Sequence, residues 1–192
     1  EQLINELDKI YDLGWRRGIF IVDDNFIGNK RKLKTDVLPA MIEWRQGKKG
    51  CRFVTEASVN LSDDDQLIEM MVEAGFTQVF VGIETPDDKG LAECSKSQNR
   101  NRDLVSSVKK LQQMGLQVMG GFIVGFDSDD ETIFERMIEF IQESGIVTAM
   151  VGLLQAPVGT QLYQRMLREG RIRNVYSGDN VDGETNIIPK ME

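Results

Sequence analysis

Short apolar runs alternate with amphipathic stretches along most of the chain. Residues 3–13 place leucine and isoleucine at helical spacing, and Gly14 follows them as a helix end. The apolar run 18–22 comes next and ends in the acids Asp23 and Asp24. A continuous apolar run of this kind is typical of a strand buried on both faces, as in parallel sheets. The pattern therefore predicts a leading helix followed by a buried strand.

The same unit of strand and helix recurs along the chain. We expect five strands, over residues 18–24, 52–58, 78–84, 116–124 and 148–154. We expect a helix after each strand, over residues 31–46, 62–74, 103–114, 129–144 and 160–169. Such alternation favours parallel strands joined by right-handed crossovers. The fold class is therefore α/β, and the units should form most of a parallel barrel. This barrel should be incomplete, because no strand precedes the leading helix.

Length and composition favour a single domain. The 192 residues are 41% hydrophobic and 28% charged, which is ordinary for a globular protein. After Gly170 the periodicity stops, and residues 177–184 are rich in glycine, asparagine and acids. The acids miss the one-three-five spacing of a calcium loop, so we expect an ordinary solvated loop there.

Charge and residue content exclude several functions. The net charge of −8 argues against a general nucleic-acid surface, and the basic cluster 30–34 is expected to be the solvated start of a helix. No apolar run approaches the roughly 18 residues that span a membrane, and the N-terminus has no signal-peptide features. Cys51 and Cys94 lie far apart, and histidine is absent, so neither a disulfide framework nor histidine-dependent catalysis is expected. A reducing cytoplasm is the simplest location.

The carboxyl ends of the predicted strands carry the candidate functional side chains. Ligands gather at these ends in parallel α/β barrels and sheets. In chain order the strand ends supply Asp23, Asp24, Asn25, Glu56, Ser58, Glu84, Gly121, Ile123, Gly125, Gln155, Ala156 and Pro157. Glu56 and Glu84 interrupt apolar strands, and a buried carboxylate is costly without a partner, so we expect both to face a ligand. A helix cap or an internal salt bridge is the alternative explanation for any one of these acids, and it is favoured for Asp23.

Glycine punctuates one predicted strand, residues 119–126. Glycine inside a strand often permits close approach of a ligand or of another backbone. The segment lacks the glycine spacing of a phosphate-binding loop. A turn at residues 157–160 follows the last strand, and Thr160 is expected to cap the helix after it.

Taken in order, the strand ends resemble those of the radical S-adenosylmethionine (radical SAM) superfamily, in the cobalamin-associated branch that carries a B12-binding domain. The segments that carry the resemblance are Val22–Phe26, Phe53–Ser58, Gly82–Glu84, Gly121–Gly125 and Pro157–Thr160. The resemblance implies a partial parallel (β/α)6 TIM-like barrel that lacks the first strand and the cluster loop. Residues 1–170 would supply units two to six, preceded by the first helix, and residues 171–192 would be a C-terminal extension.

The resemblance implies a set of residues around the methionine part of SAM. Asp24, with Asn25 beside it, occupies the position that helps to hold the methionyl amine. Glu56 and Ser58 would face the cofactor or the substrate. Lys96 sits where the family often places a basic residue for the methionyl carboxylate, although an ordinary surface lysine explains Lys96 equally well.

The resemblance also implies a set of residues around the adenosine part of SAM. Glu84 would approach the ribose hydroxyls. Ile123 and Gly125 would pack beside the adenine, on the strand that also holds Gly121. The backbone from Leu154 to Ala156 would read the edge of the adenine.

Two departures from the family pattern bear on the activity. The fifth-strand motif often ends in glutamate, whereas this chain has Ser128 there. The family binds a [4Fe–4S] cluster through CxxxCxxC after the first strand, and this motif is absent from the sequence. Cys51 and Cys94 cannot replace it, because cluster ligation needs a full set of thiolates. We therefore expect the chain to be part of a longer protein, with the cluster ligands outside it, and to be inactive alone.

In the intact enzyme, the resemblance implies that the cluster donates an electron to SAM and that a 5′-deoxyadenosyl radical forms. The expected partners are an electron donor such as flavodoxin or ferredoxin and a substrate of small-molecule or macromolecular kind. Whether the reaction uses cobalamin stays open, and if it does, another domain would bind the cobalamin. Methylation, methylthiolation and other rearrangements all stay open as the reaction. Two alternatives are a non-radical α/β-barrel lyase or isomerase, for which Lys96 is the candidate residue, and a non-enzymatic interaction module that pairs through the exposed barrel edge.

Overall fold

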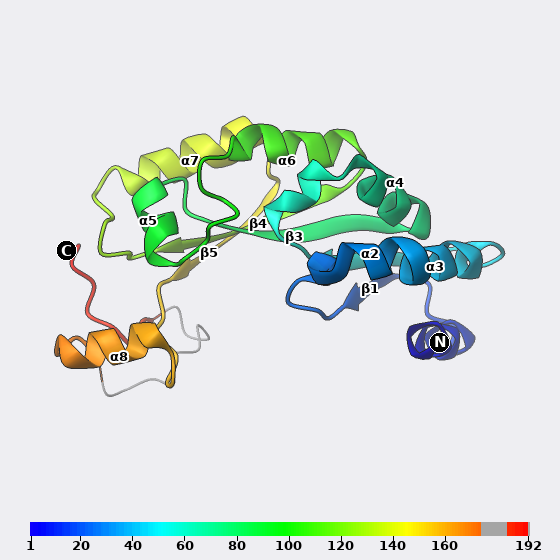
Figure 1. Ribbon diagram of the computed structural model, residues 1–192, viewed down its shortest axis with the longest axis horizontal. Helices are drawn as coiled ribbons and strands as arrows, with labels where there is room; N and C mark the ends of the chain where they lie inside the picture. Colours follow the sequence, from blue (N-terminus) through cyan, green and yellow to red (C-terminus); the bar gives the residue numbers. More distant parts are fainter. Residues whose placement is uncertain (174–183, 192) are drawn as a thin grey trace.

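The computed structural model describes residues 1–173 and 184–191, and it shows one open parallel sheet (Figure 1). Its strands are β1 (Gly18–Ile21), β2 (Arg52–Glu56), β3 (Phe76–Glu84), β4 (Gln117–Val124) and β5 (Thr148–Leu153). They lie in the order β1-β2-β3-β4-β5, and every neighbouring pair is parallel. Chain order and spatial order therefore coincide, as in a barrel wall. The predicted α/β class, the five parallel strands and the incomplete closure are confirmed.

The helices follow the strands as the periodicity predicts. They are α1 (Gln2–Asp12), α2 (Lys30–Lys32), α3 (Leu38–Arg45), α4 (Asp65–Ala74), α5 (Asp88–Glu93), α6 (Leu104–Gln113), α7 (Ile133–Ser144) and α8 (Gln161–Arg168). Short turns connect some of them: η1 (Phe26–Asn29), η2 (Leu33–Val37) and η3 (Val59–Asp63). The π-helical turn η2 joins α2 and α3, so these three elements together fill the range predicted as one helix.

Local side-chain contacts shift several predicted boundaries. The first strand ends at Ile21 rather than at residue 24, and Asp23 Oδ1 accepts the N–H of Asn25 in a turn directly after it. The helix expected from residue 129 begins at Ile133, because Asp130 Oδ1 accepts the N–H of Thr132 just before it. The connection at residues 85–100 contains the unpredicted helix α5.

Capping residues define the ends of two helices, and the predicted cap at Thr160 is confirmed. Asp64 accepts the N–H of Leu67 at the start of α4, and Gly75 ends that helix with a φ of 102°. Thr160 Oγ1 accepts the N–H of Tyr163 at a distance of 3.1 Å and so caps α8. The αL conformation at Gly75 explains why glycine stands at the helix end.

The two faces of the sheet differ in cover. Helices α4, α6 and α7 lie together along one side of the sheet in Figure 1, and side chains such as Phe53, Val79 and Ile83 are completely buried in the core. On the other face Phe20 is 46% exposed and Met150 is 59% exposed. Helices therefore cover one face of the sheet, and the other face is open to a ligand.

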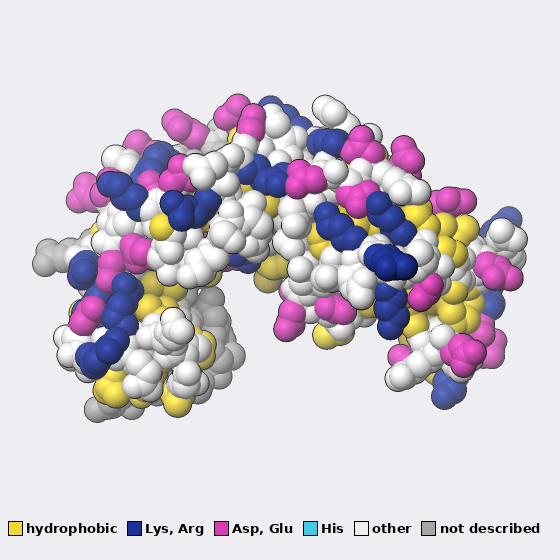
Figure 2. All heavy atoms as spheres, in the orientation of Figure 1, with side chains coloured by type: hydrophobic (Ala, Val, Ile, Leu, Met, Phe, Trp, Pro, Cys, Tyr) yellow, Lys and Arg dark blue, Asp and Glu magenta, His cyan; other side chains and the backbone are white. Residues whose placement is uncertain are grey.

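Charged side chains of both signs are interspersed over the face that Figure 2 shows, and one group of Lys and Arg side chains lies over α2 and α3. Residues 30–34 begin a helix, as predicted, and Arg31 and Lys32 are exposed, while two of the lysines also form contacts. Lys30 Nζ donates to the carbonyl of Asn60 at 3.0 Å, and Lys34 Nζ lies 2.6 Å from Asp64 Oδ1.

Among the described residues, no helix is long and apolar enough to cross a membrane.

A second, smaller core gathers the C-terminal elements at one end of the sheet. It consists of Phe126, Leu154, Ala156, Met166 and Ile187. The described part of the C-terminal extension thus packs against the ends of β4 and β5 and against α8. The domain boundary at residue 170 stays a prediction, and the loop expected at 177–184 lies outside the described residues except for Glu184.

Candidate functional site at the strand ends

Two adjoining cavities lie on the open face at the carboxyl ends of the strands. The first has a volume of about 270 Å³, and six of the predicted residues line it: Asp24, Asn25, Glu56, Ser58, Glu84 and Lys96. The second has a volume of about 410 Å³, and the predicted residues Gly121, Ile123, Leu154 and Gln155 line it with Met150 and Val151. Phe80, Gly82 and Glu84 line both cavities and so form their common border.

Four of the predicted strand-end residues lie outside both cavities: Asp23, Gly125, Ala156 and Pro157. Ala156 is completely buried in the second core. Gly125 has a φ of 103°, and its N–H donates to Asp129 at 2.8 Å. Gly125 therefore shapes the turn after β4, and a positive φ of this kind is the reason that glycine is needed there.

The ends of β1 and β2 are joined by a side-chain contact in the first cavity. Asn25 Oδ1 accepts the N–H of Ser58 at 3.1 Å and the Ser58 hydroxyl at 2.9 Å. One oxygen thus fixes the backbone after β2 relative to the backbone after β1. Asp24 and Glu56 are held next to this contact by their places in the chain, and both carboxylates line the cavity.

Glu84 occupies an unusual backbone conformation at the end of β3. Its φ is 68°, and the N–H of Thr85 donates to the carbonyl of Ile83 at 3.0 Å, which makes Glu84 the centre of a γ-turn. The buried side chain of Asn99 supports this turn, since its Nδ2 donates to the carbonyls of Gly82 and Ile83 at 3.0 Å each. Strain of this kind in a non-glycine residue clusters at functional sites.

Glu84 and Lys96 form an ion pair over β3. Lys96 Nζ lies 2.6 Å from Glu84 Oε1, and the side chains are 29% and 15% exposed, respectively. A Cβ at Gly82 would lie 2.4 Å from Glu84 Oε1 and 3.0 Å from Lys96 Nζ. The absence of a side chain at Gly82 therefore creates the space that the pair occupies. Lys96 lines the first cavity, and its role there stays a prediction.

Gly121 on β4 also leaves space for a neighbouring side chain near the border of the two cavities. Gly121 is the register partner of Gly82, and a Cβ on Gly121 would lie 2.4 Å from the ring of Phe80. The ring therefore lies directly over the backbone of β4. Ile123 comes two residues later on the same face of the strand, inside the second cavity. The glycines thus permit close approach, as the sequence pattern indicates.

Asp129 holds the turn after β4 and is not among the residues predicted from the sequence. Its Oδ2 accepts the N–H groups of Gly125 and Phe126 at 2.8 and 2.9 Å, while Oδ1 is buried without a hydrogen-bond partner among the described residues. Burial raises the pKa of the Asp129 carboxyl above its ordinary value. The neighbouring Ser128, where the family motif often has glutamate, has a buried hydroxyl that also lacks a partner in the described part of the chain.

The residues that the structure describes do not fit an iron–sulfur cluster. No group of three or more histidine, cysteine, aspartate or glutamate side chains in residues 1–173 and 184–191 is arranged to hold a metal ion. Cys51 is buried before β2, at the opposite end of the sheet from the cavities, and Cys94 follows α5. Burial raises the pKa of the Cys94 thiol, which disfavours the thiolate that a metal needs.

Sequence comparison assigns most of the chain to one family. The radical SAM superfamily matches residues 1–141, and a domain of unknown function (DUF4070) matches residues 160–192. An uncharacterized methyltransferase of Synechocystis sp. is 43% identical over 190 residues, which is 98% of this chain and 35% of the relative. The hopanoid C-2 methylase of Rhodopseudomonas palustris is 39% identical over 174 residues, which is 90% of this chain and 33% of the relative.

Comparison with solved structures supports the same fold. The radical SAM methyltransferase TsrM from Kitasatospora setae, solved with cobalamin and a [4Fe–4S] cluster, superimposes with a TM-score of 0.60 at 12% identity. The match covers 78% of this chain and 30% of that protein. The chain thus spans about a third of the length of the relatives that it matches.

Proposed function

Because this chain belongs to the radical SAM superfamily, we propose that its two adjoining cavities bind SAM as part of a longer enzyme. The proposal is supported mainly by the difference in chemistry between the two cavities, which share a common border. The first is lined by carboxylates, an amide and a lysine, and the second mainly by apolar side chains and glycine. SAM has the same division, with a zwitterionic amino acid joined to a nucleoside.

The methionine part of SAM fits the first cavity. The carboxylate of Asp24 would accept hydrogen bonds from the methionyl amine, with Asn25 and Ser58 fixing the backbone around it. The ammonium of Lys96 would attract the methionyl carboxylate. Glu56 would face the same ligand or the substrate. Charge-assisted contacts of this kind give orientation as well as affinity.

The adenosine part of SAM fits the second cavity. Glu84 lies on the border, where its carboxylate would accept hydrogen bonds from the ribose hydroxyls. Gly121 and Ile123 would provide a flat apolar surface for the adenine, and Gly125 would shape the turn beyond it. The backbone near Leu154 would then read the edge of the base.

The family implies SAM and a [4Fe–4S] cluster as cofactors, and together they supply a 5′-deoxyadenosyl radical. The described residues do not fit the cluster, so we propose that its ligands lie outside them. What these residues contribute is the orientation of SAM and the exclusion of water from one side of it. We further propose that electrons come from a small donor protein of the flavodoxin or ferredoxin kind.

Methyl transfer is the reaction that we propose for the whole protein. Both relatives described above carry names of methyl-transferring enzymes, at 43% and 39% identity. A cobalamin bound by another domain would carry the methyl group, which the TsrM structure with bound cobalamin supports. Two free cysteines suit a reducing cytoplasm. Incubation of the whole protein with a reductant, a lipid extract and SAM that carries a deuterated methyl group, followed by mass spectrometry of the extract, tests this assignment.

Binding measurements on this chain test the proposed SAM site. The probes are S-adenosylhomocysteine and 5′-methylthioadenosine, which has the nucleoside but no amino acid. Binding is expected to be weak without a cluster, so the titration is followed by NMR up to millimolar ligand. Asp24→Asn should weaken S-adenosylhomocysteine about fivefold and leave 5′-methylthioadenosine unchanged, as expected for one charged contact of about 1 kcal/mol.

Two further variants complete the comparison. Ile123→Ala should weaken both probes by the same factor, because both carry the nucleoside. Asp12→Asn, an exposed position on α1 far from the strand ends, is the matched control and should change neither. Equal effects of all three substitutions, or no binding of either probe, would contradict the proposed site.

A further inference from the structure

The buried side chain of Asn186, in the C-terminal segment, binds the backbone that follows β5. Asn186 Oδ1 accepts the N–H of Ala156 at 2.8 Å, and Asn186 Nδ2 donates to the carbonyl of the same residue at 2.7 Å. Asn186 is 1% exposed and Ala156 is completely buried. The amide thus binds both main-chain groups of one residue, as a residue of a neighbouring strand would.

The neighbours of Ala156 are held by the same segment. The Thr185 hydroxyl donates to the carbonyl of Leu154, whose N–H already donates to Val124 on β4 at 2.8 Å. Gln155 Oε1 accepts the N–H of Asn186 at 3.2 Å, and its Nε2 donates to the carbonyl of Glu184. The main-chain groups of Leu154 and Ala156 and the side chain of Gln155 are therefore all engaged.

One main-chain N–H and one main-chain carbonyl after β5 remain without a hydrogen-bond partner among the described residues. Neither the main-chain N–H nor the main-chain carbonyl of Gln155 forms a hydrogen bond with another of the described residues. Gln155 lines the second, more apolar cavity. In extended backbone the N–H and carbonyl of one residue point to the same side, and those of the next residue point to the opposite side. With both groups of Ala156 bound by Asn186, those of Gln155 are left for a ligand.

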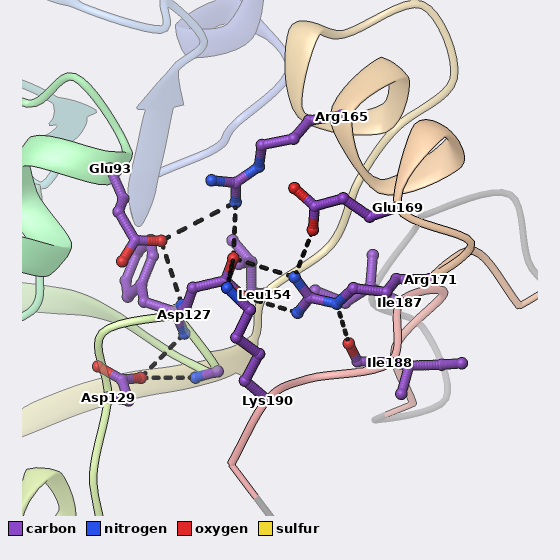
Figure 3. Close-up of polar contacts among 12 residues, drawn as sticks. Glu93, Asp127, Asp129, Leu154, Arg165, Glu169, Arg171, Ile187, Ile188 and Lys190 are labelled. Atoms are coloured by element: carbon purple, nitrogen blue, oxygen red, sulfur yellow. Dashed lines mark hydrogen bonds and ion pairs between the residues drawn. The ribbon is translucent and has the colours of Figure 1, made fainter.

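A second contact fixes the same segment to β4 (Figure 3). Arg171 donates to both carboxylate oxygens of Asp127, at 3.0 and 2.6 Å, and Lys190 Nζ lies 3.3 Å from the same carboxylate. The N–H of Ile188 donates to the carbonyl of Arg171 at 2.9 Å, and the side chain of Ile187 is 1% exposed in the second core. The segment is thus anchored at the ends of both β4 and β5.

We propose that Asn186 is a positioning residue for recognition of the adenine base. It engages the groups beside Gln155 and presents the Gln155 carbonyl to the N6 amino group and the Gln155 N–H to N1 of adenine. This inference rests on the proposed SAM site. It gives a role to a segment that the domain of unknown function covers, residues 160–192. Hypoxanthine reverses both partners, with a carbonyl at position 6 and N1–H, so the pair should reject it.

The test compares two ligands that differ only in the base, S-adenosylhomocysteine and S-inosylhomocysteine, on the full chain. The chain should bind the adenine form at least about tenfold more tightly, since each buried polar group left unpaired costs affinity. Asn186→Ala should reduce this ratio to about threefold or less, mainly by weakening the adenine form. Thr185→Val, which removes the bond to the Leu154 carbonyl and the acceptor of the Ile187 N–H but leaves Asn186 in place, should reduce the ratio by a smaller factor. Amide hydrogen exchange at Ala156 should be faster in Asn186→Ala, because Asn186 Oδ1 accepts that N–H.

Glu184→Gln is the matched control, because only the main-chain carbonyl of Glu184 is used and its side chain is exposed. It should leave the ratio unchanged. If Asn186→Ala does not fold, the ratio in Thr185→Val decides. An adenine preference that persists in these variants, or an unmodified chain that binds both ligands equally, overturns the role of Asn186 and leaves the SAM site standing. Binding of neither ligand would instead overturn the SAM site itself.

Discussion

Lys96 Nζ lies 2.6 Å from Glu84 Oε1, so the two charged side chains at the border of the cavities neutralise each other. They come from different elements, since Glu84 ends β3 and Lys96 lies in the loop after α5. A ligand with a carboxylate and two ribose hydroxyls would satisfy both side chains without separating them far. The pair therefore keeps two partly buried charges compensated until the ligand binds.

Removal of the lysine should affect only ligands that carry a carboxylate. Lys96→Met should weaken S-adenosylhomocysteine about fivefold, the effect of about 1 kcal/mol expected for a partly exposed charge pair. The affinity for 5′-methylthioadenosine should stay within a factor of two of the unmodified value. Lys89→Met, an exposed position on α5, serves as the control in the same titration. Equal weakening of both ligands by Lys96→Met would show that this lysine supports the fold rather than the carboxylate.

The left-handed backbone at Glu84 should be visible in stability. Both Glu84→Ala and Glu84→Gly remove the carboxylate, but alanine keeps a Cβ at a φ of 68° and glycine does not. Glu84→Gly should therefore be about 1 kcal/mol more stable than Glu84→Ala, although glycine usually destabilises a strand. Urea denaturation followed by circular dichroism measures the difference. A more stable alanine variant would mean that the γ-turn does not persist in solution.

The close approach of Phe80 to β4 predicts a cost for any side chain at Gly121. A Cβ there would lie 2.4 Å from the ring, so Gly121→Ala should displace Phe80 and reduce the free energy of unfolding by about 1–3 kcal/mol. Gly18→Ala on β1 is the matched control, since no atom lies within 4 Å of its Cβ position. Its effect should be below about 0.5 kcal/mol. Thermal unfolding of both variants compares them, and equal losses would argue against the ring position described.

The anchor of the C-terminal segment should weaken in acid. The Arg171 guanidinium, with Lys190, holds the pKa of Asp127 below its ordinary value. A carboxyl with a lowered pKa in the folded state contributes stability above its unfolded pKa of about 3.9, and this contribution is lost as the pH falls through the folded pKa. Asp127→Asn should remove that part of the pH dependence. Thermal unfolding between pH 3 and 7 should therefore show a shallower acid decline in the variant, and parallel curves would contradict the assignment.

The fold could largely be predicted from the sequence because each strand is a separate apolar run ended by polar residues. The capped starts and glycine ends of helices such as α4 are equally local signals. Helix α5 was missed because its six residues are too few to show a helical period. The first strand was predicted too long because Asp23 and Asp24 were assigned to it, whereas Asp23 forms a turn with Asn25.

From the sequence, only those site residues could be predicted that lie near the ends of neighbouring strands. Six of the predicted residues line one cavity because they follow or lie near the ends of neighbouring parallel strands. Asn99 and Asn186 were missed since each acts on backbone far away in the chain, at Gly82 and at Ala156. No local pattern in a sequence reports such a contact. Ala156 was expected at the ligand, yet the structure engages both of its main-chain groups with protein.

We propose that SAM binds at the carboxyl ends of β1 to β5. Two-dimensional ¹H–¹⁵N NMR spectra of the chain, titrated with S-adenosylhomocysteine, test it most directly. The largest amide shifts should map to Asn25, Glu84, Ile123 and Gln155, around the two cavities. Shifts that map instead to the opposite end of the sheet, at the cavity lined by Gly18, Arg52, Thr77 and Gln117, or no shifts at millimolar ligand, would contradict it.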